Sequence, residues 1–259
     1  MCVAREEEDG LLYNPADDMK ELHRIIKDRR CLLFIDLEGT QTTHEMIEIG
    51  AYKVILKEDL TPKKIFKPYH AYVLAKHRVG PIVTKLTGIT DMKLKKEGIP
   101  FRTVLDQLKK YLGKDHDRAL LVSYGAEDAR IILQSSENNM DASTEEARFL
   151  SRHFFDLGAF ISRFVRDESG NMLSLTNALK TFEVPFEGTA HCAQDDAYNL
   201  FLLYKAFLEK TDIVKENYKN VLGRQNHLPT PIRMVLNRLT SGETVTPELW
   251  DKLVEESLK

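Results

Sequence analysis

Short continuous runs of apolar residues alternate with helical stripes of apolar residues over the first 210 positions of the chain. The run at 31–38 predicts a strand that is buried on both faces. Segments 45–56 and 65–73 predict two further strands, which a polar turn at 57–62 joins. Three consecutive strands with such short links predict an antiparallel meander.

Helical periodicity begins after this meander. Residues 100–113 start with a proline and end with a glycine, as helices commonly do. The run at 119–125 predicts a short strand with a helix directly behind it, and 152–165 predict a strand that turns into a helix. The last long helix of this unit is predicted at 193–210. The order of elements predicts an α/β fold, a mixed sheet with helices on its faces.

The two ends of the chain differ from this central part. Residues 1–16 are polar, and we predict a flexible segment there. A helix is predicted at 17–30, where apolar positions have helical spacing, acids come early and bases come late. Residues 211–259 contain two short helical patterns and predict a small helical extension to a domain at 17–210.

Composition narrows the class of protein without identifying it. The 259 residues, 42% hydrophobic and 30% charged, suit one sizeable globular domain plus an extension. The acidic first thirty residues and the absence of a long apolar stretch lead us to expect no membrane partner and a cytoplasmic location. Three scattered cysteines exclude a disulfide framework. A net charge of −3 argues against a protein that binds non-specifically along nucleic acid. It permits an enzyme that binds one end of a nucleic-acid strand, because only the local field matters there.

Two acids stand at the end of the first predicted strand. Asp36 and Glu38 are two positions apart, so their side chains point to one face and Leu37 points to the other. Two like charges on one face repel and lose hydration unless a cation lies between them. A strand that runs out into solvent is the alternative explanation.

A divalent cation would need further oxygen ligands. Asp128 follows an apolar strand, where ligand sites of open α/β sheets form. Asp196 lies at the start of a predicted helix, and His191 precedes it by five residues. A neutral imidazole beside such a site can act as a general base near pH 7. Acids in a first helical turn also stabilise the helix locally. This explanation is sufficient for Asp195, whereas for Asp128 a local role and a role as metal ligand both stay possible.

Three spaced motifs occur together in this chain. They are "DLEGT" from Asp36, the aspartate Asp128 after a strand and a glycine, and "HCAQDDA" from His191. In this order they resemble the DEDDh 3′–5′ exonucleases, over about residues 30–210. The stretches "HEMIEIGAYKV", "LTGIT", "SLTNALKTFEVPFEGTAHC" and "DDAYN" are similar to the branch that trims histone mRNA and small RNAs, and to its bacterial relatives. Members of that branch often carry an aromatic residue before the second-motif Asp, where this chain has Glu127.

The resemblance implies a ribonuclease H-like fold and a role for each residue of the motifs. The implied catalytic set is His191 together with four metal ligands, which are Asp36, Glu38, Asp128 and Asp196. The implied substrate contacts are Leu37, Thr40 and His191. Two Mg²⁺ or Mn²⁺ ions would neutralise the acids and clamp the attacking and leaving oxygens of an in-line displacement.

We therefore expect a metal-dependent 3′–5′ exonuclease whose partners are single-stranded RNA or DNA 3′ ends, RNA favoured, and whose products are nucleoside 5′-monophosphates. A DNA-trimming or proofreading exonuclease and a non-catalytic nucleic-acid-binding adaptor with the same fold are the alternatives. A complete set of acids argues against the adaptor. One basic cluster could follow the phosphates, although a solvated edge strand explains it equally well; it comprises Lys63, Lys64, Lys67, Lys76 and Arg78.

Overall fold

The computed structural model describes residues 20–26, 28–139, 144–224 and 227–258. The segment 1–16, for which flexibility is predicted, lies outside these residues. The first helix, α1 (Lys20–Ile26), falls inside the predicted range 17–30. None of the helices in the described ranges is both long enough and apolar enough to cross a membrane.

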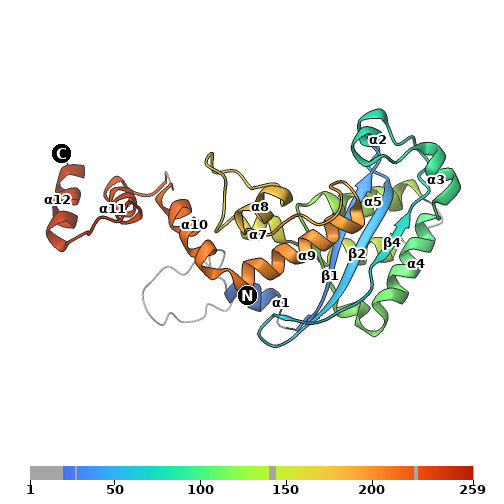
Figure 1. Cartoon of the computed structure of the whole chain (residues 1–259), viewed down its shortest axis with the longest axis horizontal. Helices are drawn as coiled ribbons and strands as arrows, with labels where there is room; N and C mark the ends of the chain where they lie inside the picture. Colours follow the sequence, from blue (N-terminus) through green and yellow to red (C-terminus); the bar gives the residue numbers. More distant parts are fainter. Residues whose placement is uncertain (1–19, 27, 140–143, 225–226, 259) are drawn as a thin grey trace, which may run out of the picture.

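The centre of the structure is a mixed sheet of six strands (Figure 1). Strand β1 (Cys31–Gly39) pairs antiparallel with β2 (Met46–Leu56) and parallel with β5 (Leu120–Ser123). The next strand outward from β5 is β6 (Phe154–Asp156), which is also parallel. The antiparallel meander and the mixed α/β sheet predicted from the sequence are therefore confirmed.

The predicted strand at 65–73 is wrong in one respect, because the chain forms two strands there. Strands β3 (Pro62–Ile65) and β4 (Tyr69–Tyr72) both pair with β2, at different positions along it. Pro68 lies in the break between them. Proline has no amide hydrogen to donate, so a continuous ladder along β2 cannot pass through this position.

Helices cover both faces of the sheet. Those that come after the meander are α2 (Pro81–Thr87), α3 (Asp91–Glu97), α4 (Phe101–Leu112), α5 (Glu127–Asn138), α6 (Thr144–Ser151), α7 (Leu157–Ile161), α8 (Leu175–Thr181) and α9 (Ala193–Glu209). A 3₁₀ turn at Gly113–Arg118 links α4 to β5. The predictions at 100–113, behind 119–125, at 152–165 and at 193–210 are confirmed, whereas α2, α3 and α6 were not predicted from the apolar pattern.

Alternation along β1 sends its side chains into two separate cores. Leu32 and Phe34 pack in the core under α9, where the ring centroids of Phe34 and Phe201 are 5.4 Å apart. Leu33 and Ile35 pack in the core beneath α4 and α5. Both faces of β1 are therefore covered, as its apolar run predicts. The face of Leu32 and Phe34 leads on to Asp36, which is thereby directed to the side of α9.

The C-terminal region holds three helices, where the pattern predicted two. They are α10 (Thr211–Gly223), α11 (Thr230–Thr240) and α12 (Pro247–Ser257). Because α9 ends at Glu209 and α10 begins at Thr211, the predicted domain limit at 210 falls between two helices. Helices α11 and α12 lie at one end of the molecule, away from the sheet (Figure 1). The division into domains stays a prediction.

Candidate active site

The start of helix α9 packs on strands β1 and β2 near the end of β1. Asp36 lies opposite Gly50 in the β1–β2 register, and Glu38 lies opposite Glu48. A β-carbon at Gly50 would come within 2.2 Å of the Ala193 backbone, so only glycine lets the first turn of α9 approach the sheet here. This close approach brings Asp196, in that first turn, over the carboxylates of β1.

Three carboxylates converge at this point. One oxygen from each of Asp36, Glu38 and Asp196 lies within 4.8 Å of the other two. All three side chains are partly exposed, so the cluster is open to small ions and to substrate. Carboxylate oxygens are the donors that Mg²⁺ and Mn²⁺ prefer in proteins, and the residues present therefore fit a divalent cation.

Asp128 holds a different position beside this cluster. It lies in the first turn of α5, is buried, and accepts a hydrogen bond of 2.8 Å at Oδ1 from the backbone N–H of Leu37. The structure thus brings three of the four predicted ligands into one group and places the fourth against the backbone between Asp36 and Glu38. The negative charge of Asp128 is close enough to Asp36 to raise the pKa of that carboxyl group.

The pKa values of all four acids lie above their ordinary range. Burial is the largest cause for Asp36, whose pKa is raised well above normal, with Asp128, Asp196, Glu38 and Glu48 adding to it. Burial and then the charge of Glu48 raise the pKa of Glu38 to about 8. Burial raises the pKa of Asp128 to about 7 against the opposing Leu37 hydrogen bond. These carboxylates repel one another, and a bound cation would relieve the repulsion.

His191 stands at the rim of the site on an unusual backbone. Its φ is 64°, in the left-handed region, and its side chain is exposed. The backbone N–H of His191, and not its imidazole, donates a 2.8 Å hydrogen bond to Oδ2 of Asp196. Burial raises the pKa of Asp196 to about 6, while this hydrogen bond and the nearby imidazole lower it. Asp195, also in the first turn of α9, accepts a 2.9 Å hydrogen bond at Oδ2 from the N–H of Thr189 in the preceding loop.

The two remaining predicted residues point their side chains inward. The Leu37 side chain packs in the core beneath α4 and α5. The Thr40 hydroxyl lies 2.8 Å from the hydroxyl of Thr43 and accepts a 2.9 Å hydrogen bond from the N–H of Glu45. Thr40 therefore shapes the turn that joins β1 to β2, and a contact of Leu37 or Thr40 with a nucleotide stays a prediction.

Sequence reasoning missed a second pair of residues at the site. Glu48 faces Glu38, is 2% exposed, and accepts a 3.3 Å hydrogen bond from the N–H of Ala193 at the start of α9. Its other oxygen lies 2.7 Å from Nε2 of His70. The available signal was an acid inside the apolar strand segment "MIEIGA", since an acid at such a position is buried only with partners.

A mixed sheet with helices on both faces, and with acids from one strand and two helices gathered at the carboxyl end of its interior strand β1, defines the class of ribonuclease H-like nucleases. The exonuclease family RNase_T matches residues 33–204, which is most of the chain. The chain belongs to this family, and with it to the superfamily of DEDDh 3′–5′ exonucleases. Comparison with curated proteins finds no match.

Solved structures share the fold at low sequence identity. A full-length 3′-exonuclease has a TM-score of 0.56 and 18% identity, over 74% of this chain and 69% of that one. The nuclease domain of 3′hExo, described as a DEDDh family member bound to rAMP, has a TM-score of 0.57 and 17% identity, over 70% and 93%. Exonuclease I of E. coli with a dT13 oligonucleotide has a TM-score of 0.54 and 15% identity, over 72% of this chain but only 42% of that one. At these identities the likeness establishes the fold alone.

Proposed function

We propose that this chain is a metal-dependent 3′–5′ exonuclease that hydrolyses single-stranded nucleic acid, RNA in preference to DNA, to nucleoside 5′-monophosphates. The observation that carries the proposal is the group formed by Asp36, Glu38 and Asp196, whose oxygens lie within 4.8 Å of one another. Such a group of like charges is costly to a fold, and phosphodiester hydrolysis at a divalent metal centre accounts for it.

The residues have distinct roles in this proposal. Asp36, Glu38, Asp196 and Asp128 would hold two Mg²⁺ or Mn²⁺ ions, which would supply Lewis-acid stabilisation of the attacking and leaving oxygens. His191 accepts the proton of the attacking water, which its exposed position at the rim allows. The terminal nucleotide docks along the backbone of Leu37 and the turn that Thr40 holds. Glu48 and His70 position the start of α9 behind the acids.

A lobe beside the site supports a polymeric substrate. We call residues 74–98, which include α2 and α3, the basic lobe: they carry six Lys or Arg and two acids, whereas the whole chain has a net charge of −3. The buried carboxylate of Glu45 fixes this lobe by accepting a 2.7 Å hydrogen bond from the N–H of Lys76 and by pairing with His77. The Gln41 N–H donates to the Val79 carbonyl at 2.9 Å. The lobe is therefore attached to the end of β1 that carries the acids.

The basic cluster anticipated from the sequence does not follow one path. Lys63 and Lys64 lie on β3, which pairs with β2 between Val54 and Leu56. That part of β2 lies beside the start of β1 at Cys31, at the end away from Asp36. Lys76 and Arg78 belong to the basic lobe instead. The solvated edge strand therefore explains Lys63 and Lys64, and the lobe is the part suited to phosphates.

The preference for RNA rests on the stretches that resemble the RNA-trimming branch. One structure of similar fold is described as recognising the 3′ end of a histone mRNA stem-loop, while another holds a DNA oligonucleotide. A DNA-trimming exonuclease is thus the second candidate. A non-catalytic adaptor is disfavoured, because a binding module has no use for a group of mutually repelling acids.

One experiment tests direction, substrate and metal together. RNA and DNA of the same sequence, labelled at the 5′ end and carrying a free hydroxyl or a phosphate at the 3′ end, are incubated with Mn²⁺ or with chelator. We expect shortening from the free 3′ end, faster for RNA, and none with chelator. Covalently closed circles of each polymer serve as a control. Efficient cutting of circles would identify an endonuclease and refute the proposal, and equal or faster cutting of DNA would select the second candidate.

A further inference from the structure

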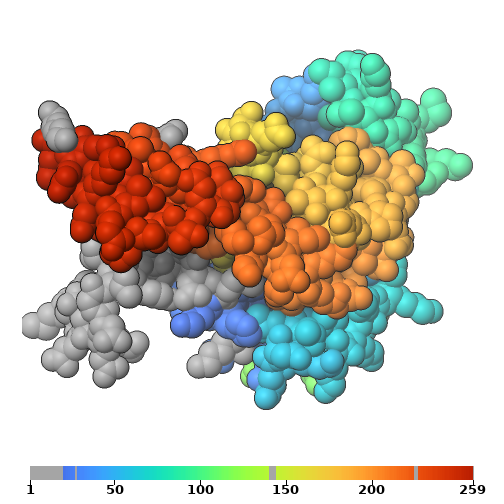
Figure 2. Space-filling view, turned by 60° about the vertical axis from the view of Figure 1, so that its left-hand side comes forward, coloured from blue at the N-terminus to red at the C-terminus, as the bar shows by residue number. Residues whose placement is uncertain are grey.

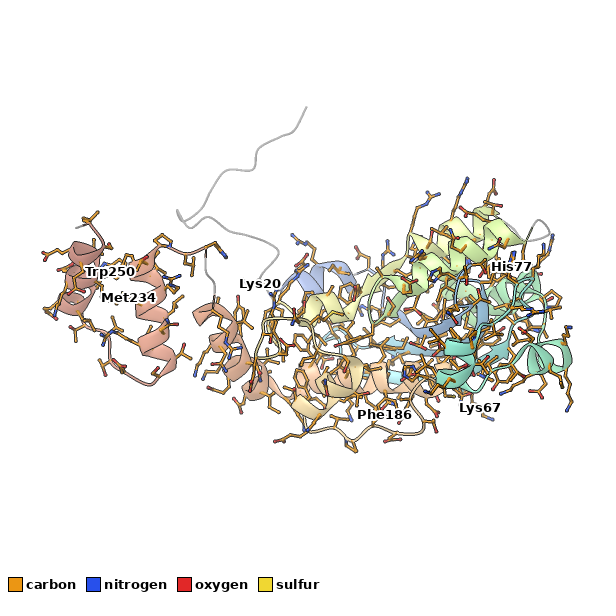
Figure 3. All side chains as sticks on the ribbon, turned by 90° about the horizontal axis from the view of Figure 1, so that it is seen from above. Lys20, Lys67, His77, Phe186, Met234 and Trp250 are labelled. Carbon is orange, nitrogen blue, oxygen red and sulfur yellow. The ribbon has the colours of Figure 1, made fainter. Side chains whose placement is uncertain are left out.

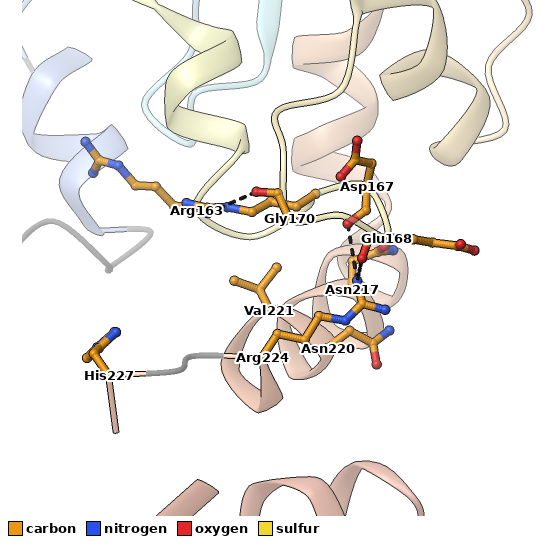
Figure 4. Close-up of a pocket in the computed structure, with 10 residues that line it drawn as sticks. Arg163, Asp167, Glu168, Gly170, Asn217, Asn220, Val221, Arg224 and His227 are labelled. Carbon is orange, nitrogen blue, oxygen red and sulfur yellow. Dashed lines mark hydrogen bonds between the residues drawn. The ribbon is translucent and has the colours of Figure 1, made fainter. Parts of the chain in front are cut away.

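The first C-terminal helix packs on the nuclease domain, and the two after it pack in series, α11 on α10 and α12 on α11. Val214 of α10 joins the main core, and the ring of Tyr218 lies 5.1 Å from that of Phe164. At the end of α10, Arg224 donates hydrogen bonds of 3.2 and 3.0 Å to the carbonyls of Asp167 and Glu168 (Figure 4). Helix α10 is therefore a fixed support for the two helices after it.

We call α11 and α12 the arm. Among the described residues of these two helices, Leu253 is the one that is buried. Each helix has 11 residues, and helices of that length are marginal in water without tertiary packing. The arm extends from α10 as a separate lobe at the surface (Figures 1 and 2). In the described part of the chain α11 packs on α10 and α12 packs on α11, and since Leu253 alone is buried each helix still has an uncovered face.

The arm concentrates exposed apolar side chains. Of the eleven large hydrophobic residues that are exposed in the described part of the chain, five lie between 230 and 258. They are Ile232, Met234, Leu239, Trp250 and Leu258. Figure 3 shows Met234 on α11 and Trp250 on α12, at the end of the molecule opposite His77. Ile232 and Leu239 share one face of α11, and an exposed apolar face of this kind is typical of a protein interface.

The charges of the arm indicate what covers it. Helix α11 carries two arginines and no acid, whereas α12 carries four acids and one lysine. On α11, Arg233 and Arg238 lie on opposite flanks of the stripe formed by Ile232, Val235, Leu236 and Leu239. Within the described ranges, no ion pair joins α11 to α12. Arg238 pairs with Glu243 of its own chain, a half-exposed contact that an acid of a partner helix can replace, so each helix offers charges that the other complements.

A second copy of this chain satisfies both features. If α11 of one copy packs on α12 of the other, the apolar stripes meet and the arginines face the acids, and the two-fold relation repeats the contact. Only one face of each 11-residue helix can contact the partner, so the arm supplies a small interface, below the roughly 20–30 residues per side of a standard one. Nucleic acid fits poorly, because the acids of α12 would repel its phosphates.

We propose that the arm is a dimerisation device through which two copies of this chain associate as a four-helix assembly, each α11 packed against the partner copy's α12. This proposal does not depend on the proposed nuclease activity. The two active sites would then be carried at the outer ends of one dimer.

The test is a charge exchange in the full chain. The first variant carries Arg233→Glu and Arg238→Glu, and the second carries Asp251→Lys and Glu255→Lys. We expect the wild type to be a dimer by light scattering after gel filtration and each variant alone to be a monomer. An equimolar mixture should form a dimer again, because both α11–α12 contacts become complementary in the mixed pair.

Controls separate loss of pairing from loss of folding. Lys63→Glu with Lys64→Glu, a reversal of equal size on β3, should leave the dimer intact. Trp250 is the single tryptophan of the chain, so its emission should shift to longer wavelength when the wild type is diluted. Three outcomes would each overturn the proposal. They are a wild type that is monomeric at every soluble concentration, a variant that forms a dimer by itself, and a mixture of the two variants that stays monomeric.

Discussion

The carboxylate of Asp128 accepts a 2.8 Å hydrogen bond from the backbone N–H of Leu37, the residue between Asp36 and Glu38. Helix α5 is thereby fastened to the strand end that presents the acids. Asp128 consequently combines a structural contact with a negative charge at the site, and two substitutions separate these contributions.

Asp128→Asn keeps an oxygen that can accept the Leu37 hydrogen bond but removes the charge. We expect hydrolysis to fall at least ~100-fold, because electrostatic preorganisation at the metal centre is lost. Asp128→Ala should be less stable than Asp128→Asn by about 1–3 kcal/mol, since it leaves a buried N–H without a partner. Turnover numbers and thermal melts of both variants make the comparison. Activity near that of the wild type in Asp128→Asn would remove Asp128 from the catalytic set.

Without metal, the chain should lose stability as the pH rises. The pKa values of Glu38, Asp128 and Asp196 are raised to about 8, about 7 and about 6, against about 4 in an unfolded chain. Between pH 4 and 8 the folded state therefore binds more protons than the unfolded state, and raising the pH through this window destabilises the fold. Melting temperatures in chelator, measured from pH 5 to 8, should fall.

The variant Glu38→Gln identifies the source of this slope. It should flatten the pH dependence and raise the metal-free melting temperature at pH 8 by several degrees, since ~1 kcal/mol shifts it by about 2–4 °C in a chain of this size. Added Mn²⁺ stabilises a protein to the extent that it binds the folded site. The wild type should therefore gain more than the variant, which lacks one of the carboxylates. Glu97→Gln, a change at an exposed acid of α3, is the matched control. An equal pH slope in Glu38→Gln and in the wild type would contradict the cluster as its origin.

Much of this architecture can be predicted from local patterns, and the exceptions have physical causes. The run at 31–38 predicted β1 because a strand with two covered faces is apolar at every position. Helix α2 left no such trace, since none of its residues is buried. Pro68 divides a segment whose composition is typical of one strand. The position of Pro68 was visible, but its effect depends on pairing with β2, which the composition of the segment does not reveal.

The site shows the same division between local and distant information. Asp36 and Glu38 were predicted from alternation along one strand, which needs only neighbouring residues. The contact of Glu48 with His70 spans 22 positions, and its contact with Ala193 spans 145. Such pairs depend on strand register and on the close passage of α9 over Gly50. The resemblance to a family supplied the order of the motifs, and the roles of the individual residues stay predictions.

Two histidines lie near the acids, and they should behave differently when replaced. Replacing His191 by Asn, which tolerates a positive φ, keeps the backbone hydrogen bond to Asp196. If His191 is the base, the wild-type rate should rise with pH as the base loses its proton, and His191→Asn should lose this limb of the profile. His70→Ala should keep the limb but lower the melting temperature, because the buried Glu48 loses one of its two partners and keeps only the N–H of Ala193. An unchanged pH profile in His191→Asn would assign proton transfer elsewhere.

The basic lobe should determine how substrate affinity responds to salt. Lys95 and Lys96 are exposed on α3. If the strand upstream of the 3′ end crosses this lobe, Lys95→Gln with Lys96→Gln should raise KM for a long oligonucleotide several-fold and leave kcat unchanged, because the substitutions leave the acids of the site in place. The slope of log KM against log salt should decrease by about 0.7 for each phosphate that the variant no longer neutralises.

Two controls distinguish a defined path over the lobe from a general electrostatic effect. A dinucleotide, too short to reach the lobe, should show neither the rise in KM nor the smaller salt slope. Lys63→Gln with Lys64→Gln on β3 removes the same charge at the other end of the sheet and should leave KM unchanged, because β3 pairs with the part of β2 that lies away from Asp36. An equal rise in KM for both double variants would indicate a general field around the protein and would rule out a defined path over the lobe.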